Sequence, residues 1–283
     1  MIAHVAAAYE DSGRVVLWLD PESKCSPTLL DAPVRLAAAF DADIETIIVD
    51  QEPDDRGGVP VRRVRSIAGS SEEAVVISRR FQLLAERCRR LTESVGAIHR
   101  VNIRHRNAHG DAIDRISEMC AVIGPWNIVA LARMPALGGH SVIGSLLANV
   151  SGATGFLLCG DKPADDIPHV VVIFEDVDRL PSMLRAAERL SGAAGVIHVL
   201  IGAETSVDYA EIEAQARLMA VASDRVVFET AGPTFGIPGA LTEAIARLKP
   251  SFVVARFGGS ALADGRELAR ASASTRAPIL LVR

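Results

Sequence analysis

Short apolar runs that stop at an acid or a proline alternate along this chain with segments whose apolar residues recur every three or four positions. Runs of the first kind are typical of buried strands, and the longer spacing is typical of amphipathic helices. The predicted strands are 15–19, 44–49, 98–103, 127–131, 155–158, 170–174, 196–201, 225–229, 252–255 and 278–282. The predicted helices are one that follows Ser26 or Thr28, then 71–95, 111–123, 142–150, 180–190, 209–222, 238–248 and 262–272. Strands that alternate with helices form a parallel sheet through right-handed crossovers, so the pattern predicts an α/β fold.

The pattern runs through the chain twice. Residues 161–168 are polar and hold two prolines, which is typical of a linker. Beyond them Val-Val-Val-Ile-Phe-Glu at 170–175 matches Val-Val-Leu-Trp-Leu-Asp at 15–20, and Phe-Val-Val-Ala-Arg at 252–256 matches Ile-Val-Ala-Leu-Ala-Arg at 128–133. An internal repeat of this kind indicates tandem copies of one unit. We therefore predict two domains, residues 1–162 and a shorter one at 168–283, each with a five-stranded parallel sheet flanked by helices.

Composition narrows the class of protein. Hydrophobic residues make up 49% of the chain and aromatic residues only 4%, which suits buried parallel strands under alanine-rich helices. No apolar stretch approaches the roughly 20 residues of a membrane span, and the N-terminus lacks a basic segment followed by an apolar one. We expect a cytoplasmic protein with no membrane partner. The cysteines are far apart and form no CxxC pair, so we expect reduced thiols and no metal site: Cys25, Cys88, Cys120 and Cys159.

Charge is unevenly distributed around the net value of −5. Residues 62–106 hold eleven arginines, no lysine and four acids. Such a segment can meet an acidic protein or a nucleic acid, or it can be a solvated helix whose arginines pair with acids elsewhere in the chain. Phe81 is the one aromatic residue there for base stacking, which counts against nucleic acid. We expect the solvated helix, with an acidic protein partner at helix 71–95 as the alternative.

These features resemble a tandem universal stress protein, a family with flavodoxin-like or Rossmann-like, adenine nucleotide alpha hydrolase-like domains. The resemblance covers about 14–158 and 170–283. It rests on a first strand that ends at Asp20, an alanine-rich first helix, a second strand that closes at Asp50, and a Gly- and Ser-containing loop before the last short helix and strand. It implies that Asp20 and Ile48 frame the adenosine of ATP or AMP, with the phosphates on a loop of the form G-x2-G-x9-G-[ST] after strand four.

That loop departs from the family pattern in both copies. In the first copy Ala132 and Pro135 replace the first two glycines, and the remaining candidates lie further on: Gly138, Gly139, Gly144 and Ser145. In the second copy Gly258 fits the second glycine, but Ala255 replaces the first and no Gly-Ser or Gly-Thr follows at the required distance. Glycines let the backbone approach phosphate oxygens, so their loss counts against ATP binding.

Other candidate residues lie at the carboxyl ends of the predicted strands. Arg133 and Arg256 follow strand four in each copy, where an arginine can grip a phosphate or carboxylate, or pair with the first-strand acids Asp20 or Glu175. The pairs Gly138-Gly139 and Gly258-Gly259, each followed closely by a serine, can bind anions through their amides or serve as plain turns.

Two histidines complete the set of candidates. His105 and His109 bracket a predicted turn, and we interpret them as loop residues rather than metal ligands.

No catalytic constellation is evident, and no G-x-S-x-G elbow is present. The function that we predict is a non-catalytic stress-response regulator or binding module. It would be a homodimer, or a pseudo-dimer of its own halves paired through the last strands, 156–158 and 279–282. The alternatives are an ATP- or AMP-binding protein with weak ATPase activity in the first domain, and an enzyme related to electron-transfer flavoproteins or adenine nucleotide hydrolases.

Overall fold

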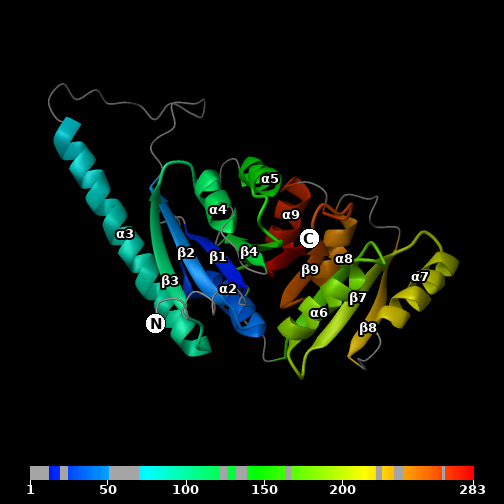
Figure 1. Cartoon of the computed structure of the whole chain (residues 1–283). Helices are drawn as coiled ribbons and strands as arrows, with labels where there is room; N and C mark the ends of the chain where they lie inside the picture. The colour runs from blue at the N-terminus through cyan, green and yellow to red at the C-terminus, as the bar shows by residue number, and fades with distance from the viewer. Residues whose placement is uncertain are drawn as a thin grey trace.

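A computed structural model describes residues 13–19, 25–50, 70–121, 126–131, 139–162, 167–220, 225–232, 239–262 and 265–283. Its strands are β1 (Arg14–Leu19), β2 (Asp43–Asp50), β3 (Ile103–His109), β4 (Asn127–Leu131), β5 (Gly155–Leu158), β6 (His169–Phe174), β7 (Val196–Gly202), β8 (Val226–Gly232), β9 (Phe252–Arg256) and β10 (Ile279–Val282). They form one ten-stranded sheet in the order β3-β2-β1-β4-β5-β10-β9-β6-β7-β8 (Figure 1). The predicted α/β class with two parallel half-sheets is confirmed.

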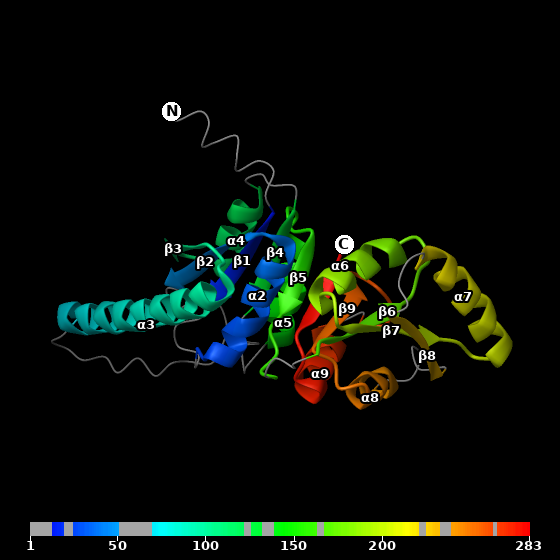
Figure 2. The ribbon, with the colours of Figure 1, turned by 90° about the horizontal axis from the view of Figure 1, so that it is seen from below.

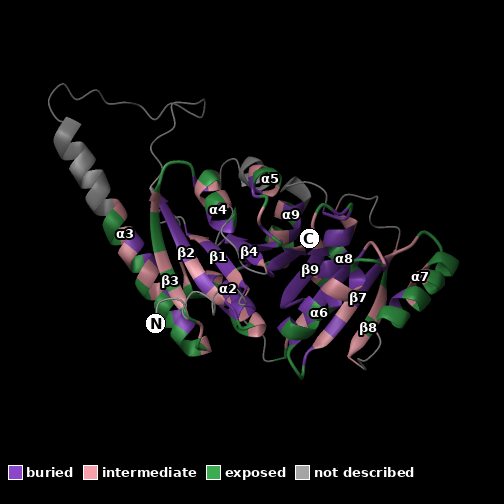
Figure 3. Ribbon diagram, viewed as in Figure 1, coloured by how far each residue is buried: buried purple, intermediate pink, exposed green. Residues whose placement is uncertain are grey.

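Helices cover both faces of this sheet (Figure 2). They are α2 (Pro27–Phe40), α3 (Ser70–His99), α4 (Ala112–Ala121), α5 (Gly139–Asn149), α6 (Leu180–Ser191), α7 (Ser206–Met219), α8 (Ala240–Arg247) and α9 (Gly265–Thr275). Buried side chains of α2, α3, α6 and α7 pack with one face of the strands, and those of α4, α5, α8 and α9 pack with the other. The central strands are purple along their length in Figure 3, because both of their faces are covered.

Polar residues fix where several helices begin and end. The Ser26 hydroxyl accepts a hydrogen bond from the Leu29 amide at the start of α2, and the Thr205 hydroxyl accepts one from the Asp208 amide at the start of α7. Such caps satisfy amides that have no partner inside the helix. Helix α2 ends at Asp41, whose φ of 52° is left-handed. Within the described residues no helix is long and apolar enough to cross a membrane.

The two half-sheets join through one antiparallel pair, β5 with β10, whereas every other neighbouring pair is parallel. Leu157 lies opposite Leu280, and Phe156 and Leu158 lie opposite Leu281 and Ile279. The pairing is therefore symmetric about the Leu157–Leu280 pair, as expected for two related halves that meet on a pseudo-twofold axis. The prediction that strands 156–158 and 279–282 pair the two halves is confirmed.

Reciprocal side-chain contacts support this junction on the face covered by α2 and α6. The Arg35 guanidinium lies 4.9 Å from the centre of the Phe252 ring, and the Arg189 guanidinium lies 5.0 Å from the centre of the Phe40 ring. Each arginine stacks on a ring of the other half, at a distance where cation–π attraction is favourable. On the opposite face Phe156 stacks on Phe257 across the junction, with ring centres 5.4 Å apart.

The predicted strand 98–103 is wrong. Helix α3 continues to His99, and the strand is instead Ile103–His109, so the predicted turn between His105 and His109 is also wrong. Ile98, which looked like a strand start, is 75% exposed on the helix. The chain reverses at Arg100, whose φ is 58°, and Ile103 then packs so close to Gly96 that a Cβ there would overlap it.

The arginines of this region that the structure describes largely pair with acids of the same chain. Arg89 and Arg90 contact Glu86, and the exposed edge strand β3 carries further pairs, Arg104 with Asp43 and Arg106 with Glu45. For this segment we predict from the sequence a solvated helix whose arginines pair with acids elsewhere in the chain. An acidic partner at helix 71–95 stays a prediction, and the side chains of residues 70–80 lie outside the described set.

The packing at this junction leads to a prediction about the stability of the protein. Leu280→Ala removes a fully covered side chain from the pseudo-twofold axis, and we expect it to lower the free energy of unfolding by about 2–5 kcal/mol. Leu218→Ala is the matched control, because Leu218 is 71% exposed and should change stability by less than about 0.5 kcal/mol. Urea unfolding followed by circular dichroism measures both. Equal effects of the two substitutions would contradict a junction built on this pair.

A second prediction concerns pH. The Arg276 guanidinium, whose Nε lies 2.7 Å from Asp161 Oδ1, lowers the pKa of Asp161 below its usual value of 3.8. A carboxyl with a lowered pKa in the folded state adds stability above its unfolded pKa, and that stability is lost as the pH falls through the folded value. Asp161→Asn should therefore lower the unfolding midpoint slightly at pH 7, since both side chains are more than half exposed. Once the pH has fallen below the lowered pKa of Asp161 in the folded state, the difference should vanish; a difference that persists in fully protonating acid would rule out the ion pair as its cause.

Candidate functional site

The carboxyl ends of β6 and β9 form the candidate site that the structure describes most fully. These strands are neighbours, so the residues that follow them meet at one edge of the sheet. Glu175 and Asp176 follow β6, Arg256 is the last residue of β9, and the turn Gly258–Ser260 comes directly after it. Gly258 has a φ of 68°, a conformation that favours glycine, and the Gly259 amide closes the turn on the Arg256 carbonyl at 3.3 Å.

The Glu175 carboxylate occupies this glycine turn. Its Oε2 accepts the Ser260 amide at 2.5 Å and the Ser260 hydroxyl at 3.0 Å. A Cβ at Gly259 would overlap the carboxylate, so only glycine lets the two approach this closely. Backbone amides and a hydroxyl in such a turn are the groups that bind phosphate oxygens in nucleotide sites. Here they bind an anion that belongs to the chain itself.

The second carboxylate oxygen of Glu175 strengthens this conclusion. Oε1 is buried and has no hydrogen-bond partner among the described residues. An ionised carboxylate without full compensation favours nearby cations and donors and repels another anion. A phosphate that approached the Ser260 amide would therefore have to displace Glu175 or meet its charge.

Arg256 also has a partner within the chain. Its Nη1 lies 3.1 Å from Asp176 Oδ2, and the two side chains are 37% and 32% exposed. We predicted either a ligand-binding role for this arginine or pairing with a strand-one acid; the structure pairs it with an acid, and the ligand-binding role stays a prediction. The partner is Asp176 rather than the expected Glu175, because Glu175 turns toward the glycine turn.

The first copy's candidate residues are only partly described. Ile48 is buried in β2, where it pairs with Leu19 of β1. Three predicted site residues, Asp20, Arg133 and Gly138, lie outside the described residues. Their predicted roles stay predictions.

Gly139, Gly144 and Ser145 do not lie in a loop. Gly139 is the first residue of α5, and Gly144 and Ser145 lie inside that helix, more than one turn past its start. Only the first amides of a helix are free to bind a ligand, so the Gly144 amide is engaged in the helix. Gly144-Ser145 therefore cannot form the end of a phosphate loop as the motif has it; the predicted helix 142–150 also contains this pair, and the structure begins that helix at Gly139.

The strand registers also correct the matching of Arg133 to Arg256. Val15 pairs with Ile128 in the first copy, and Val170 pairs with Phe252 in the second. Since Val15 and Val170 are equivalent in the repeat, Ile128 corresponds to Phe252. Counting along the sequence, Ala132 rather than Arg133 then corresponds to Arg256.

His105 is a structural residue of β3. Its Nδ1 lies 2.7 Å from the Thr46 hydroxyl, and its Nε2 lies 3.1 Å from Glu93 Oε1. The carbonyl of His109, at the end of the same strand, accepts the Arg115 Nε–H at 3.1 Å. Among the described residues no cluster of three or more His, Cys, Asp or Glu side chains could hold a metal ion.

The four cysteines are all free thiols in the structure. Burial raises the pKa of Cys120 to about 11, and burial raises that of Cys159 further. Such thiols are poor nucleophiles at neutral pH.

The hydrogen bonds between Glu175 and Ser260 are the contact at this site that the sequence analysis does not predict. Both residues were singled out, Glu175 as the counterpart of Asp20 and Ser260 as part of a glycine turn. The available signal was the replacement of aspartate by glutamate, whose extra methylene lets the carboxylate reach the turn.

No protein-family model matches this sequence, and no curated protein matches it. Solved structures do share its fold. A universal stress protein from Archaeoglobus fulgidus is 13% identical with a TM-score of 0.62, covering 97% of each chain. A protein of unknown function from Pseudomonas aeruginosa is 15% identical with a TM-score of 0.52, covering 97% of this chain and 94% of its own. The cytoplasmic domain of a prokaryotic cation chloride cotransporter is 9% identical with a TM-score of 0.53, covering 96% and 95%. At these identities the likeness shows the fold, which is that of universal stress proteins.

Proposed function

We propose that this protein is a cytoplasmic, universal-stress-protein-like binding module that regulates other molecules without catalysis and whose second domain does not take a nucleotide. The observation that carries the proposal is the Glu175 carboxylate in the glycine turn, 2.5 Å from the Ser260 amide. The Ser260 amide is taken by Glu175 and the Gly259 amide by the Arg256 carbonyl, so neither is free to bind a phosphate. ATP brings several negative charges to this place and gains little there.

The surroundings of the turn support the same reading. Arg256, the cation nearest in sequence to the turn, is paired with Asp176, so a phosphate would also have to break that ion pair. The apparatus for phosphoryl transfer is a set of cations and a positioned water or base around the phosphates. At this edge of the second domain the Arg256 cation is instead paired with Asp176, and Glu175 adds a further carboxylate.

The pairing of the two halves within one chain fits a binding module that acts as a monomer. We infer that the antiparallel β5–β10 pair gives one chain the arrangement that two single-domain subunits would form, so that a monomer is the functional unit. A homodimer of this chain is the alternative. Size-exclusion chromatography with light scattering separates them, and a mass of twice 30.0 kDa would contradict the monomer.

Ligand-dependent melting tests the absence of nucleotide binding. Thermal unfolding of the full chain with ATP, AMP or FAD at millimolar concentration should show no rise in melting temperature, because only a ligand that binds the folded state can raise it. A clear rise with ATP or AMP would favour the alternative of a first domain that binds nucleotide with weak ATPase activity, and a rise that persists in Arg133→Ala would overturn the exclusion of nucleotide from the second domain. Arg133→Ala would then test that domain. A rise with FAD would favour the flavoprotein alternative.

A substitution at Glu175 tests the mechanism of exclusion. Glu175→Ala removes the internal anion from the turn, and we expect tripolyphosphate to raise the melting temperature of this variant by a few degrees while leaving the wild type unchanged. Glu188→Ala, which removes an acid from the surface of α6, is the control for net charge. The same response in all three proteins, or none in Glu175→Ala, would argue against a turn that Glu175 keeps closed.

A further inference from the structure

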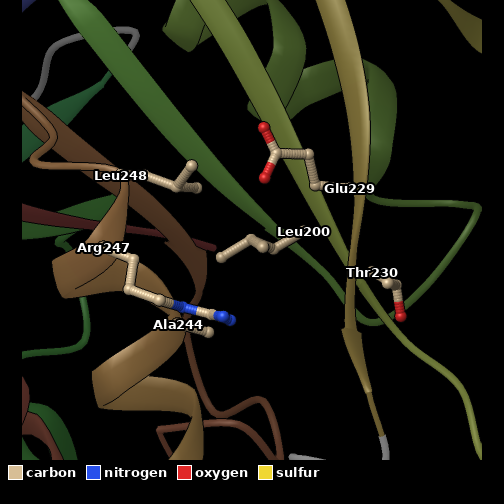
Figure 4. Close-up of a pocket in the computed structure, with 6 residues that line it drawn as sticks. All are labelled: Leu200, Glu229, Thr230, Ala244, Arg247 and Leu248. Carbon is tan, nitrogen blue, oxygen red and sulfur yellow. The ribbon is translucent and has the colours of Figure 1, made fainter.

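A hollow of about 400 Å³ lies between the outer strands of the second half-sheet and helix α8. Leu200, Glu229 and Thr230 of β7 and β8 form one wall, and Ala244, Arg247 and Leu248 at the end of α8 form the other. Figure 4 shows Glu229 and Arg247 reaching into this space from opposite walls, with Leu200 between them. The hollow is distinct from the edge site, since Glu175, Arg256 and Ser260 do not line it.

In the first copy a set of side-chain hydrogen bonds, which we call the clamp, holds the end of the corresponding helix α4 on the sheet. There Arg14 donates to the Asn127 Oδ1 at 2.7 Å and to the carbonyl of Met119, and Asn127 donates to the Cys120 carbonyl at 3.3 Å. Met119 and Cys120 are in the last turn of α4, so these bonds hold the end of that helix on the sheet.

The second copy has shorter side chains at the clamp positions. By register, His169 corresponds to Arg14 and Ser251 to Asn127. The His169 amide donates to the Ser251 hydroxyl at 3.2 Å, which ties these two strands together. Helix α8 has eight residues where α4 has ten. The last turn of this shorter helix lies against the hollow, through Ala244 and Arg247.

The hollow holds two complementary charged side chains, of which Glu229 contacts His198 and Arg247 has no ion-pair partner among the described residues. The His198 Nδ1 lies 2.8 Å from Glu229 Oε1, a hydrogen bond that orients the carboxylate; its Oε2 has no hydrogen-bond partner among the described residues. Arg247 makes no ion pair within the described part of the chain. A carboxylate and a guanidinium that face one space across an aliphatic floor fit a ligand with an ammonium group, a carboxylate and an apolar body.

We propose that this hollow is a binding site for a small aliphatic zwitterion of the size of an apolar amino acid or dipeptide. Its ammonium would donate to Glu229, its carboxylate would accept from Arg247, and its aliphatic body would lie against Leu200, Ala244 and Leu248. The site goes beyond the proposed function, because it needs no nucleotide and no part of the sheet edge. An anion alone leaves the second oxygen of Glu229, Oε2, without a donor, and a cation alone leaves Arg247 without an acceptor.

Three probes with similar carbon skeletons test the ligand class. L-Leucine carries both charged groups, 4-methylpentanoate lacks the ammonium, and 3-methylbutylamine lacks the carboxylate. Titration of the full chain, labelled in its Leu and Ala methyl groups, should shift the signals of Leu200, Ala244 and Leu248 with leucine. We expect the other two probes to bind at least about tenfold more weakly, since each loses one charge-assisted hydrogen bond.

Variants of the two charged walls complete the test. Glu229→Gln and Arg247→Met should each weaken leucine binding by about tenfold or more, while Glu243→Gln, in the first turn of α8 and outside the hollow, should leave it unchanged. Both changed side chains are partly or fully exposed, so the fold should tolerate them. Absence of methyl shifts with leucine, equal binding of the three probes, or binding that is insensitive to both variants would overturn the proposal.

Discussion

The antiparallel pairing of β5 with β10 is the constraint on which the rest of the structure depends. Each of these strands is buried on both faces and is four residues long, so neither could remain an open edge without exposing apolar side chains and unpaired backbone groups. Pairing them turns two five-stranded sheets into one of ten and places the least polar strands at its centre. The outer edges, β3 and β8, are then the strands that can carry charged residues, and they do.

Strands near the centre of the sheet could be predicted from the sequence more accurately than the edge strand β3. Asn127–Leu131 and Gly155–Leu158 are continuous apolar runs with all residues buried, and their predicted bounds agree with the structure. Strand β3 reads Ile-Arg-His-Arg-Asn-Ala-His and shows no such run, because an edge strand covered on one face needs few apolar residues. The apolar residues just before it drew the prediction to 98–103. Tertiary position, rather than local pattern, decides the strand there.

The location of the candidate site at the sheet edge could be predicted from the sequence, but its side-chain contacts could not. The glycine turn after β9 and the acid after β6 could be placed at one sheet edge from the alternation of elements alone. Which acid enters the turn depends on side-chain length and turn geometry: Glu175 reaches Ser260, and Asp176 is left to pair with Arg256. The phosphate-loop motif places Gly144 at the end of a loop, whereas the apolar pattern predicts a helix at 142–150. The structure agrees with the helix and begins it at Gly139.

Comparison of the two copies shows how the same framework has come to hold different charges in corresponding places. Glu45 and Arg106 of the first copy form an ion pair that lies at the register positions of His198 and Glu229 in the second. In the first copy Arg14 adds to that pair and reaches α4, so its charges are used to hold a helix. In the second copy the carboxylate is on the edge strand, its partner is a histidine, and the helix above it is shorter. The sheet does not need these charges for its own stability, because the cores on both faces are apolar. The edge positions of a duplicated sheet are therefore where one copy can gain a ligand while the other keeps a structural ion pair.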